Sequence, residues 1–420
     1  MQKYKQLLIL LGMTILLSSC GNKTCTLDGK SICTNENKTG YQIEEKAKIT
    51  IEVNDKNYGE AIVKLWNESY PQHSNALTYV IVKDKKISDY KTKDVVNPDL
   101  MLVNDRSIGA LQDIILEIDE DIENYFEIKT NKNYTKVLNK QDIRYIPMET
   151  HGLLFTYDIS KLKELEIKEE SMKSIEALIA TKKENIMYMN SNFNYVYPLL
   201  SSDFTILEKN IANKQELDST EFKNALMNYK TIYEGLKLKD EPKLVDSYFI
   251  NQNYASGLVD EWMQIEQSEE LNGSKIVYSK LPTYKDKQLY TLGISKGYVV
   301  SKDTKYPSMA NQVLVMLRGQ RGMQIFIDNN LAIASIKDED IDLFKYNKAH
   351  YKEKVSAYNG SIQMPLVGLS KNSSISAIDY YYSVGFNDKL NMYINNKLDL
   401  ENTQNGIVKD SNAWLNENNK

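Results

Sequence analysis

The chain has 420 residues, enough for two domains or for one large bilobed body with a substantial core. Its 52 basic and 57 acidic side chains leave a formal net charge of −5, so the composition gives no one-sided basic footprint. We therefore expect no nucleic-acid partner.

The N-terminus has the organisation of a secretion signal. A basic start precedes an apolar stretch from Leu7 to Leu17, which is too short to span a membrane. The tetrapeptide "LSSC", ending at Cys20, resembles the lipobox of bacterial lipoproteins. That resemblance implies loss of residues 1–19 and acylation of Cys20, with acyl chains such as palmitate as the membrane anchor. The alternative is an ordinary cleaved signal with a chance cysteine.

Residues 20–45 have no hydrophobic period and are rich in Asn, Lys, Thr and Gly, as flexible linkers are. We expect a lipid-anchored linker. Cys25 and Cys33 fall in it, and outside the cell they could form a disulfide. A metal site would need more ligands than these two cysteines, so we expect no metal.

Strand and helix patterns alternate after the linker. Lys46–Val53, Ala76–Val82 and Asp99–Val103 read as strands. Between the first two, "EAIVKLWNESY" has helical spacing, and Pro71 should end that helix. Strands alternating with helices predict a parallel α/β sheet, in which ligands bind beyond the carboxyl ends of the strands.

Two of these predicted strands end in an acid beside a base. Asp55 and Lys56 follow the first strand, and Asp105 and Arg106 follow the third. Both pairs stand where an α/β sheet binds its ligand. The alternative for the second pair is that Asp105 caps the next helix while Arg106 lies solvated on its first turn.

The middle of the chain, residues 160–273, is expected to be mostly helical. The clearest helix is "STEFKNALMNYKTIYEGL", with an aromatic and apolar stripe at steps of three and four and Gly235 as an end signal. We interpret this stripe as core. Strand character returns at Tyr290–Ser301, and more helices follow.

Motifs for catalysis are missing from the sequence. Three histidines are present, and none belongs to an H-E-x-x-H pattern. G-x-S-x-G, Walker A and G-x-G-x-x-G motifs are also absent. We expect neither an enzyme nor a bound cofactor.

Taken together, these stretches resemble the sugar-binding proteins of ABC importers, and among them the maltose/maltodextrin-binding proteins. "VNDKNYG" is similar to the family's first strand end, which implies that Asp55 and Lys56 contact sugar. "VNDRSIG" matches the second, which implies that Asp105 and Arg106 bind sugar hydroxyls.

The resemblance extends weakly through the rest of the chain, from about residue 46 to 395. "YIPMETHGLLFTYD" looks like the crossover into the second lobe, with His151 where the family has a glutamate. Other stretches resemble the segments that carry the family's aromatic contacts. The candidate contacts from these segments are His151, Tyr195, Tyr197, Tyr254, Tyr380 and Tyr381.

The resemblance implies a two-lobed α/β fold with a ligand cleft between the lobes. We expect lobe I to comprise residues 46–148 and about 297–330, and lobe II about 149–296 and 331–412. The implied function is a monomeric, lipid-anchored receptor on the outer face of the cell membrane, which closes on an oligosaccharide and delivers it to the permease subunits. A receptor for another solute, or a surface lipoprotein for adhesion or interaction, remains the alternative.

Overall fold

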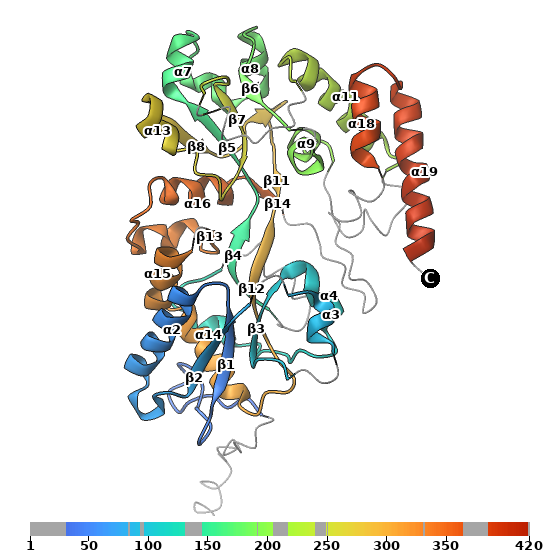
Figure 1. Cartoon of the computed structure of the whole chain (residues 1–420). Coiled ribbons are helices and arrows are strands. Elements are labelled where there is room, and N and C mark those ends of the chain that lie inside the picture. The colour runs from blue at the N-terminus through green and yellow to red at the C-terminus, as the bar shows by residue number, and fades with distance from the viewer. Residues whose placement is uncertain are drawn as a thin grey trace, which may run out of the picture.

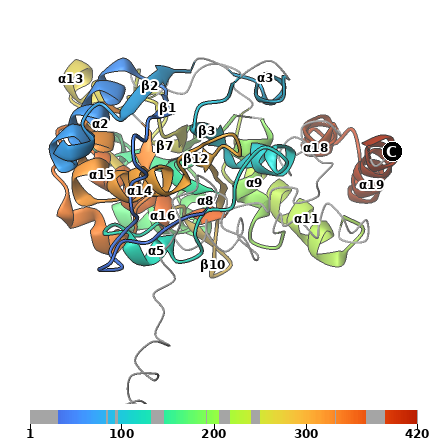
Figure 2. The same ribbon diagram turned by 90° about the horizontal axis from the view of Figure 1, so that it is seen from below.

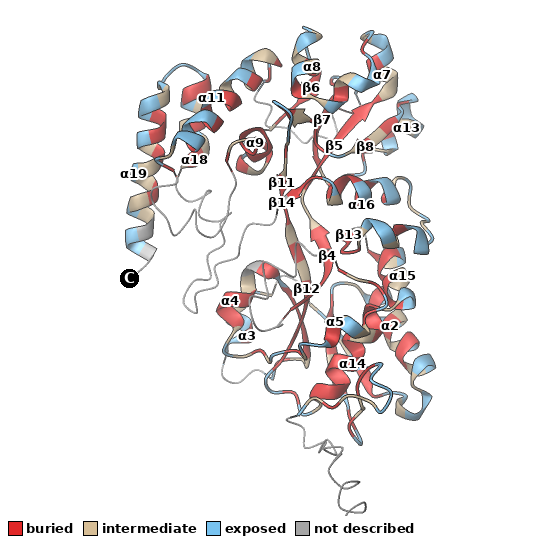
Figure 3. Cartoon of the chain, turned by 180° about the vertical axis from the view of Figure 1, so that it is seen from behind, coloured by how far each residue is buried: buried red, intermediate tan, exposed pale blue. Residues whose placement is uncertain are grey.

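The computed structural model describes residues 31–82, 85–92, 96–130, 145–190, 192–204, 217–239, 249, 251–330, 332–363 and 385–418. The described side chains exclude those of Arg106, Gln363, Leu415 and Asn418. The chain forms two lobes, each with a sheet flanked by helices, as predicted (Figure 1). Buried residues concentrate along the two sheets and in helix α14, Pro307–Leu317 (Figure 3).

The sheet of the first lobe has six strands in the order β13-β4-β12-β3-β1-β2. The three predicted strands form its parallel part, with β1 in contact with both β2 and β3. β12 runs antiparallel to β3 and β4, and β13 runs antiparallel to β4, so the sheet is mixed rather than parallel throughout. The bounds are β1 Ile49–Val53, β2 Leu77–Ile81, β3 Leu100–Asn104, β4 Ile146–His151, β12 Ile294–Val300 and β13 Ile333–Ala334.

Helix α2, Lys56–Ser69, connects β1 to β2 and packs beside β2. Asp55 caps its first turn, and Tyr58, Ile62, Leu65 and Trp66 form its buried face. Pro71 opens a separate 3-10 turn, so the helix ends where the sequence predicts. Gly59 permits the close approach, because a Cβ there would lie 2.5 Å from the ring of Tyr79 on β2.

The other helices of this lobe cover the sheet or connect its strands. α14 and α15 follow β12, while α3 and α4 flank β3 (Figure 1). Their bounds are α3 Ile87–Tyr90, α4 Ile108–Leu111, α5 Ile122–Tyr125 and α15 Gln320–Asn329.

The second lobe is built on a four-stranded sheet in the order β6-β7-β5-β8. The segment expected to be mostly helical therefore also supplies the strands β6, Met187–Tyr188, and β7, Ser256–Asp260. β5 is Leu153–Asp158 and β8 is Ile276–Ser279. Around them lie α7 Ile159–Glu164, α8 Ile175–Ala180, α9 Phe193–Leu200, α13 Gln267–Asn272 and α16 Tyr351–Asn359.

Three helices pack together at one side of the second lobe. They are α11 Thr220–Gly235, α18 Phe386–Ile394 and α19 Leu400–Asn418 (Figure 2). The predicted stripe of α11 is core, with Phe222, Leu226 and Tyr229 fully buried, and this helix ends at Gly235 as expected.

The lobes are joined where strands run from one to the other. β4 ends at His151 and β5 begins at Leu153, so a single residue separates the two sheets. β12 returns the chain to the first sheet at Ile294. The expected lobe boundaries at 148/149 and 296/297 thus fall inside β4 and β12, and β13 pairs with the first sheet although its residues were expected in lobe II.

Residues 31–45, expected to be part of the flexible linker, make hydrogen bonds to helix α14. Glu44, 3% exposed, accepts hydrogen bonds from the first backbone N–H groups of α14, those of Ser308 at 2.7 Å and Met309 at 2.9 Å. The Cys33 N–H also donates to Ser308 Oγ at 2.9 Å. Cys33 is disulfide-bonded, while Cys20 and Cys25 lie outside the described residues. The composition of the segment could not predict these contacts, because the hydrogen-bond partners are more than 260 residues away in the sequence.

Candidate functional site

A cavity of about 540 Å³ lies between the two sheets, at the carboxyl ends of β1 and β3. The crossing strands β4 and β12, the residues after β7, and the end of α15 complete its wall. We call it the cleft cavity. Its lining residues are Asn54, Asp55, Asn104, Glu149, His151, Glu261, Trp262, Lys296, Asn329, Asn330 and Ala332.

The two residues of the first predicted pair, Asp55 and Lys56, lie in different surroundings at the end of β1. Asp55 lines the cleft cavity while its Oδ1 accepts from the N–H groups of Asn57 at 2.7 Å and Tyr58 at 3.1 Å. The other carboxylate oxygen of Asp55 is not used in these caps. Lys56 is exposed on α2, where its ammonium lies 3.6 Å from Glu60, and it is not among the lining residues.

Asp105, the acid of the second predicted pair, is buried against strand β12. Asp105 is 2% exposed, and its Oδ2 accepts from the Ser295 N–H at 2.9 Å. Asn104 rather than Asp105 lines the cleft cavity. The Asp105 carboxylate thereby ties the end of β3 to β12. The side chain of Arg106 lies outside the described part, so its contact with sugar stays a prediction.

His151 stands at the end of β4 between two carboxylates from different lobes. Its Nδ1 is 2.6 Å from Glu261 Oε1, and its Nε2 is 3.2 Å from Glu149 Oε1. Burial alone would lower its pKa, but the hydrogen bonds and charges of Glu149 and Glu261 outweigh burial and raise the pKa to about 10. His151 is therefore an imidazolium at neutral pH, and it holds Glu261 against the crossing point.

Glu261 also fixes the crossing itself, since its Oε2 accepts the Gly152 N–H at 3.1 Å. On the other side, the Lys296 ammonium lies 4.0 Å from Glu149 Oε1. A β-bulge between Lys296 and Gly297 sets the direction of this part of β12. A Cβ at Gly297 would lie 2.1 Å from the Ile146 carbonyl oxygen, so the bulge requires glycine there.

Trp262 gives the cleft cavity a flat apolar surface. It is 53% exposed, unusual for so large a side chain, and it follows directly after Glu261 at the end of β7. Sequence reasoning missed both residues. The signal was present, because "LVDEW" places acids at the carboxyl end of a strand, as at Asp55 and Asp105.

Three of the predicted aromatic contacts, Tyr195, Tyr197 and Tyr254, are not among the residues that line this cavity. Tyr195 donates its hydroxyl to Asp260 Oδ2 at 2.9 Å, and Tyr254 packs edge-on against Tyr188 with ring centroids 5.7 Å apart. Tyr197 has no exposed surface. All three side chains belong to the core of the second lobe, and Tyr380 and Tyr381 lie outside the described residues.

Within the described ranges, no cluster of three or more His, Cys, Asp or Glu side chains could hold a metal ion. Over the same ranges, no helix combines the length and apolar character that crossing a membrane requires.

The chain has the fold of the two-lobed solute-binding proteins, as solved structures show. In particular, it is similar to proteins that bind maltose and maltodextrins, at low sequence identity. No model of a protein family matches the sequence, and neither does any curated protein.

One similar structure is a cyclo/maltodextrin-binding protein complexed with maltotetraose. It has a TM-score of 0.69 and 16% identity, with 88% of this chain and 97% of that chain covered. A second is an extracellular solute-binding protein from Staphylococcus aureus in complex with maltose, with a TM-score of 0.70, 15% identity and coverage of 88% and 98%. A third is a maltodextrin-binding protein from L. casei BL23 without ligand, with a TM-score of 0.65, 13% identity and coverage of 87% and 98%.

Proposed function

We propose that this protein is the substrate-binding receptor of an ABC importer and that it captures a saccharide in the cleft cavity. The observation that carries the proposal is the composition of that cavity, in which carboxylates, amides and cations surround one half-exposed tryptophan. A sugar has hydroxyls on its rim and apolar C–H groups on its faces, so it matches a site that offers both. The ligands of the similar structures support the same class.

In this proposal, side chains from both lobes contact the sugar. Asp55 and Asn104 of the first lobe bind hydroxyls on one side of the sugar. On the other side, Glu261 accepts from hydroxyls with the lone pairs that its contacts to His151 and Gly152 leave over. Trp262 stacks on a sugar face. Hydrogen bonds with a charged partner contribute about 1.5–3 kcal/mol each, so a few of them plus the stacked ring suffice for micromolar affinity, about 8 kcal/mol.

Closure of the lobes about the crossing strands would bring these groups together on the ligand. We propose His151 as a part of this hinge and not as a ligand contact of its own, because both of its ring nitrogens already face carboxylates. A closed, loaded receptor would then be recognised by the permease subunits, with the receptor acting as a monomer.

Isothermal titration of the purified protein with maltose, maltotetraose and a panel of other saccharides tests the binding proposal. We expect at least one saccharide to bind in the micromolar range and to raise the melting temperature, since a ligand at one hundred times its Kd stabilises by about 2.7 kcal/mol. If amino acids or peptides bind and no saccharide does, the protein is a receptor for another class of solute. Binding of none of these would favour an interaction lipoprotein.

We further propose that Cys20 carries the lipid anchor on the outer face of the membrane. Cys20→Ala should move the protein from the membrane fraction to the medium or leave the signal uncleaved. Membrane association and processing identical to the wild type would refute the anchor without affecting the binding proposal.

A further inference from the structure

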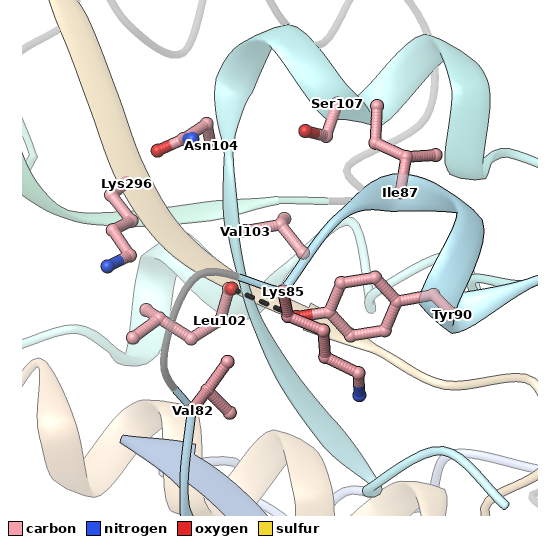
Figure 4. A pocket seen from close by; sticks show the side chains of 9 residues that line it. All are labelled: Val82, Lys85, Ile87, Tyr90, Leu102, Val103, Asn104, Ser107 and Lys296. Atoms are coloured by element: carbon pink, nitrogen blue, oxygen red, sulfur yellow. Dashed lines mark hydrogen bonds between the residues drawn. The ribbon is translucent and has the colours of Figure 1, made fainter. Parts of the chain in front are cut away.

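A second, smaller pocket of about 170 Å³ opens beside the cleft cavity (Figure 4). The two share Asn104 and Lys296 in their linings, so the smaller pocket lies next to the cleft cavity. The lining residues are Val82, Lys85, Ile87, Tyr90, Leu102, Val103, Asn104, Ser107 and Lys296. We call it the basic pocket. None of its residues is used by the proposed hydroxyl contacts except Asn104.

The charged side chains that line the basic pocket are both cations. Lys85 and Lys296 approach it from different elements, the segment before α3 and strand β12, and Figure 4 shows them on different walls. Asn104 and Ser107 add uncharged polar groups, while Val82, Ile87, Leu102 and Val103 make the remaining surface apolar. The lining therefore supplies hydrogen-bond donors in excess of acceptors.

A buried carboxylate beneath the pocket holds Lys85 in place. Glu52 of β1 has no exposed surface, and its Oε1 lies 2.9 Å from the Lys85 ammonium. Its Oε2 accepts from the Tyr90 hydroxyl at 2.8 Å and the Leu102 N–H at 3.0 Å. The ammonium also lies 3.9 Å from the centroid of the Tyr90 ring. Glu52 thus fixes the position of Lys85 and compensates one positive charge.

Lys296 has no comparable partner among the described residues. Its ammonium is 4.0 Å from Glu149, beyond hydrogen-bond distance, and Glu149 is itself 3.2 Å from the His151 imidazolium. The lining of the basic pocket itself holds two ammonium groups and no carboxylate, whereas Glu149 and Glu261, which neighbour Lys296 and His151, line the cleft cavity. A small anionic group would meet these donors there, and the volume of about 170 Å³ is enough for more than one water molecule.

From this geometry we infer that the basic pocket receives the carboxylate of an acidic saccharide, such as a uronic acid unit, whose sugar ring occupies the cleft cavity. The inference rests on the proposed function and names the substrate class within it. Lys296 at the junction binds the carboxylate, Lys85 contributes a second donor, and Ser107 and Asn104 bind the remaining lone pairs. Hydrogen bonds in which both partners are charged are stronger than those between neutral groups.

The test compares two ligands that differ only in this group. Maltotriose and the same trisaccharide with one terminal glucose oxidised at C6 to glucuronate are titrated into the purified protein at low and high salt. The acid form should bind about tenfold tighter at low salt, and the preference should shrink as salt screens the charges. Equal or weaker binding of the acid form, with the neutral sugar bound, would overturn this inference and leave the proposed function intact. If neither form binds, both this inference and the proposed saccharide-binding function are refuted.

Ser107→Asp tests the pocket directly, because it places a negative charge in the basic pocket without touching the cleft cavity lining. It should abolish the preference for the acid and leave maltotriose affinity within about twofold. Ser88→Asp is the matched control, since this exposed serine of α3 lies outside both linings. An acid preference that survives Ser107→Asp would place the carboxylate elsewhere. The paired substitution Glu52→Gln with Lys85→Met removes the second ammonium without leaving a buried carboxylate unpaired, and should reduce the preference in part.

Discussion

Replacing Trp262 with alanine gives the sharpest test of the cleft cavity as a sugar site. The side chain is 53% exposed, about 100 Å² on the scale of a tryptophan. If a sugar face covers this area, the stacked surface contributes about 2.5 kcal/mol at 25 cal/mol per Å². Loss of the ring should then raise Kd roughly 70-fold, whereas Trp262→Phe should retain part of the affinity.

The assay is isothermal titration with the best saccharide from the panel, together with the melting temperature of the empty protein. Because the ring is half exposed, we expect Trp262→Ala to leave the empty protein nearly as stable as wild type. Leu271→Ala is the matched control. Leu271 is 67% exposed on α13 and does not line the cleft cavity, so its removal should leave affinity unchanged. Wild-type affinity in Trp262→Ala, or an equal loss in Leu271→Ala, would refute the stacking role.

Three further predictions concern the frame around the cavity. Glu44→Ala should lower the free energy of unfolding in urea by about 1–3 kcal/mol, because two N–H groups of α14 lose their acceptor. Its neighbour Glu45 is exposed, so Glu45→Ala should change this free energy by less than about 0.5 kcal/mol. Asp105→Ala should lower the free energy of unfolding by about 1–3 kcal/mol, because the buried N–H of Ser295 loses its acceptor. Asn104→Ala should instead weaken saccharide binding and leave the stability nearly constant. The reverse pattern would show that Asp105 contacts the ligand. His151, with its pKa raised to about 10, contributes stability that is complete below the unfolded pKa near 6.5 and is lost as the pH rises toward 10. Denaturation curves from pH 6 to 10 should therefore fall more steeply for wild type than for His151→Gln, and parallel curves would contradict the assigned ion pair.

The local pattern of the sequence was sufficient for the elements of the first lobe and for the longest helix of the second. β1, β2 and β3 lie at the predicted positions, and α2 ends before Pro71. These features depend on spacing within a few residues, and the buried stripe of α11 follows from the same 3.6-residue period. The position of Asp55 beside a ligand cavity also follows from a local rule, because parallel strands present their carboxyl ends on one edge.

Which of the two similar acids, Asp55 and Asp105, lines the cavity was decided only by the tertiary structure. Asp105 looks like Asp55 in the sequence, but the neighbouring strand β12 supplies the Ser295 N–H and buries its carboxylate. Ser295 lies 190 residues further along the chain, beyond any local window. For the same reason the tyrosines of the second lobe could not be divided into core and surface before their packing was known.

The crossing between the lobes and the N-terminal segment also depend on pairings between residues far apart in the sequence. His151 and Glu261 are 110 residues apart, and Glu44 reaches α14 over more than 260. Local composition determined that residues 31–45 are polar, but it could not determine that one of these carboxylates completes the first turn of a distant helix. A sequence fixes the chemical groups a segment carries, whereas their hydrogen-bond partners are settled only when the sheets assemble and bring distant backbone N–H groups within reach.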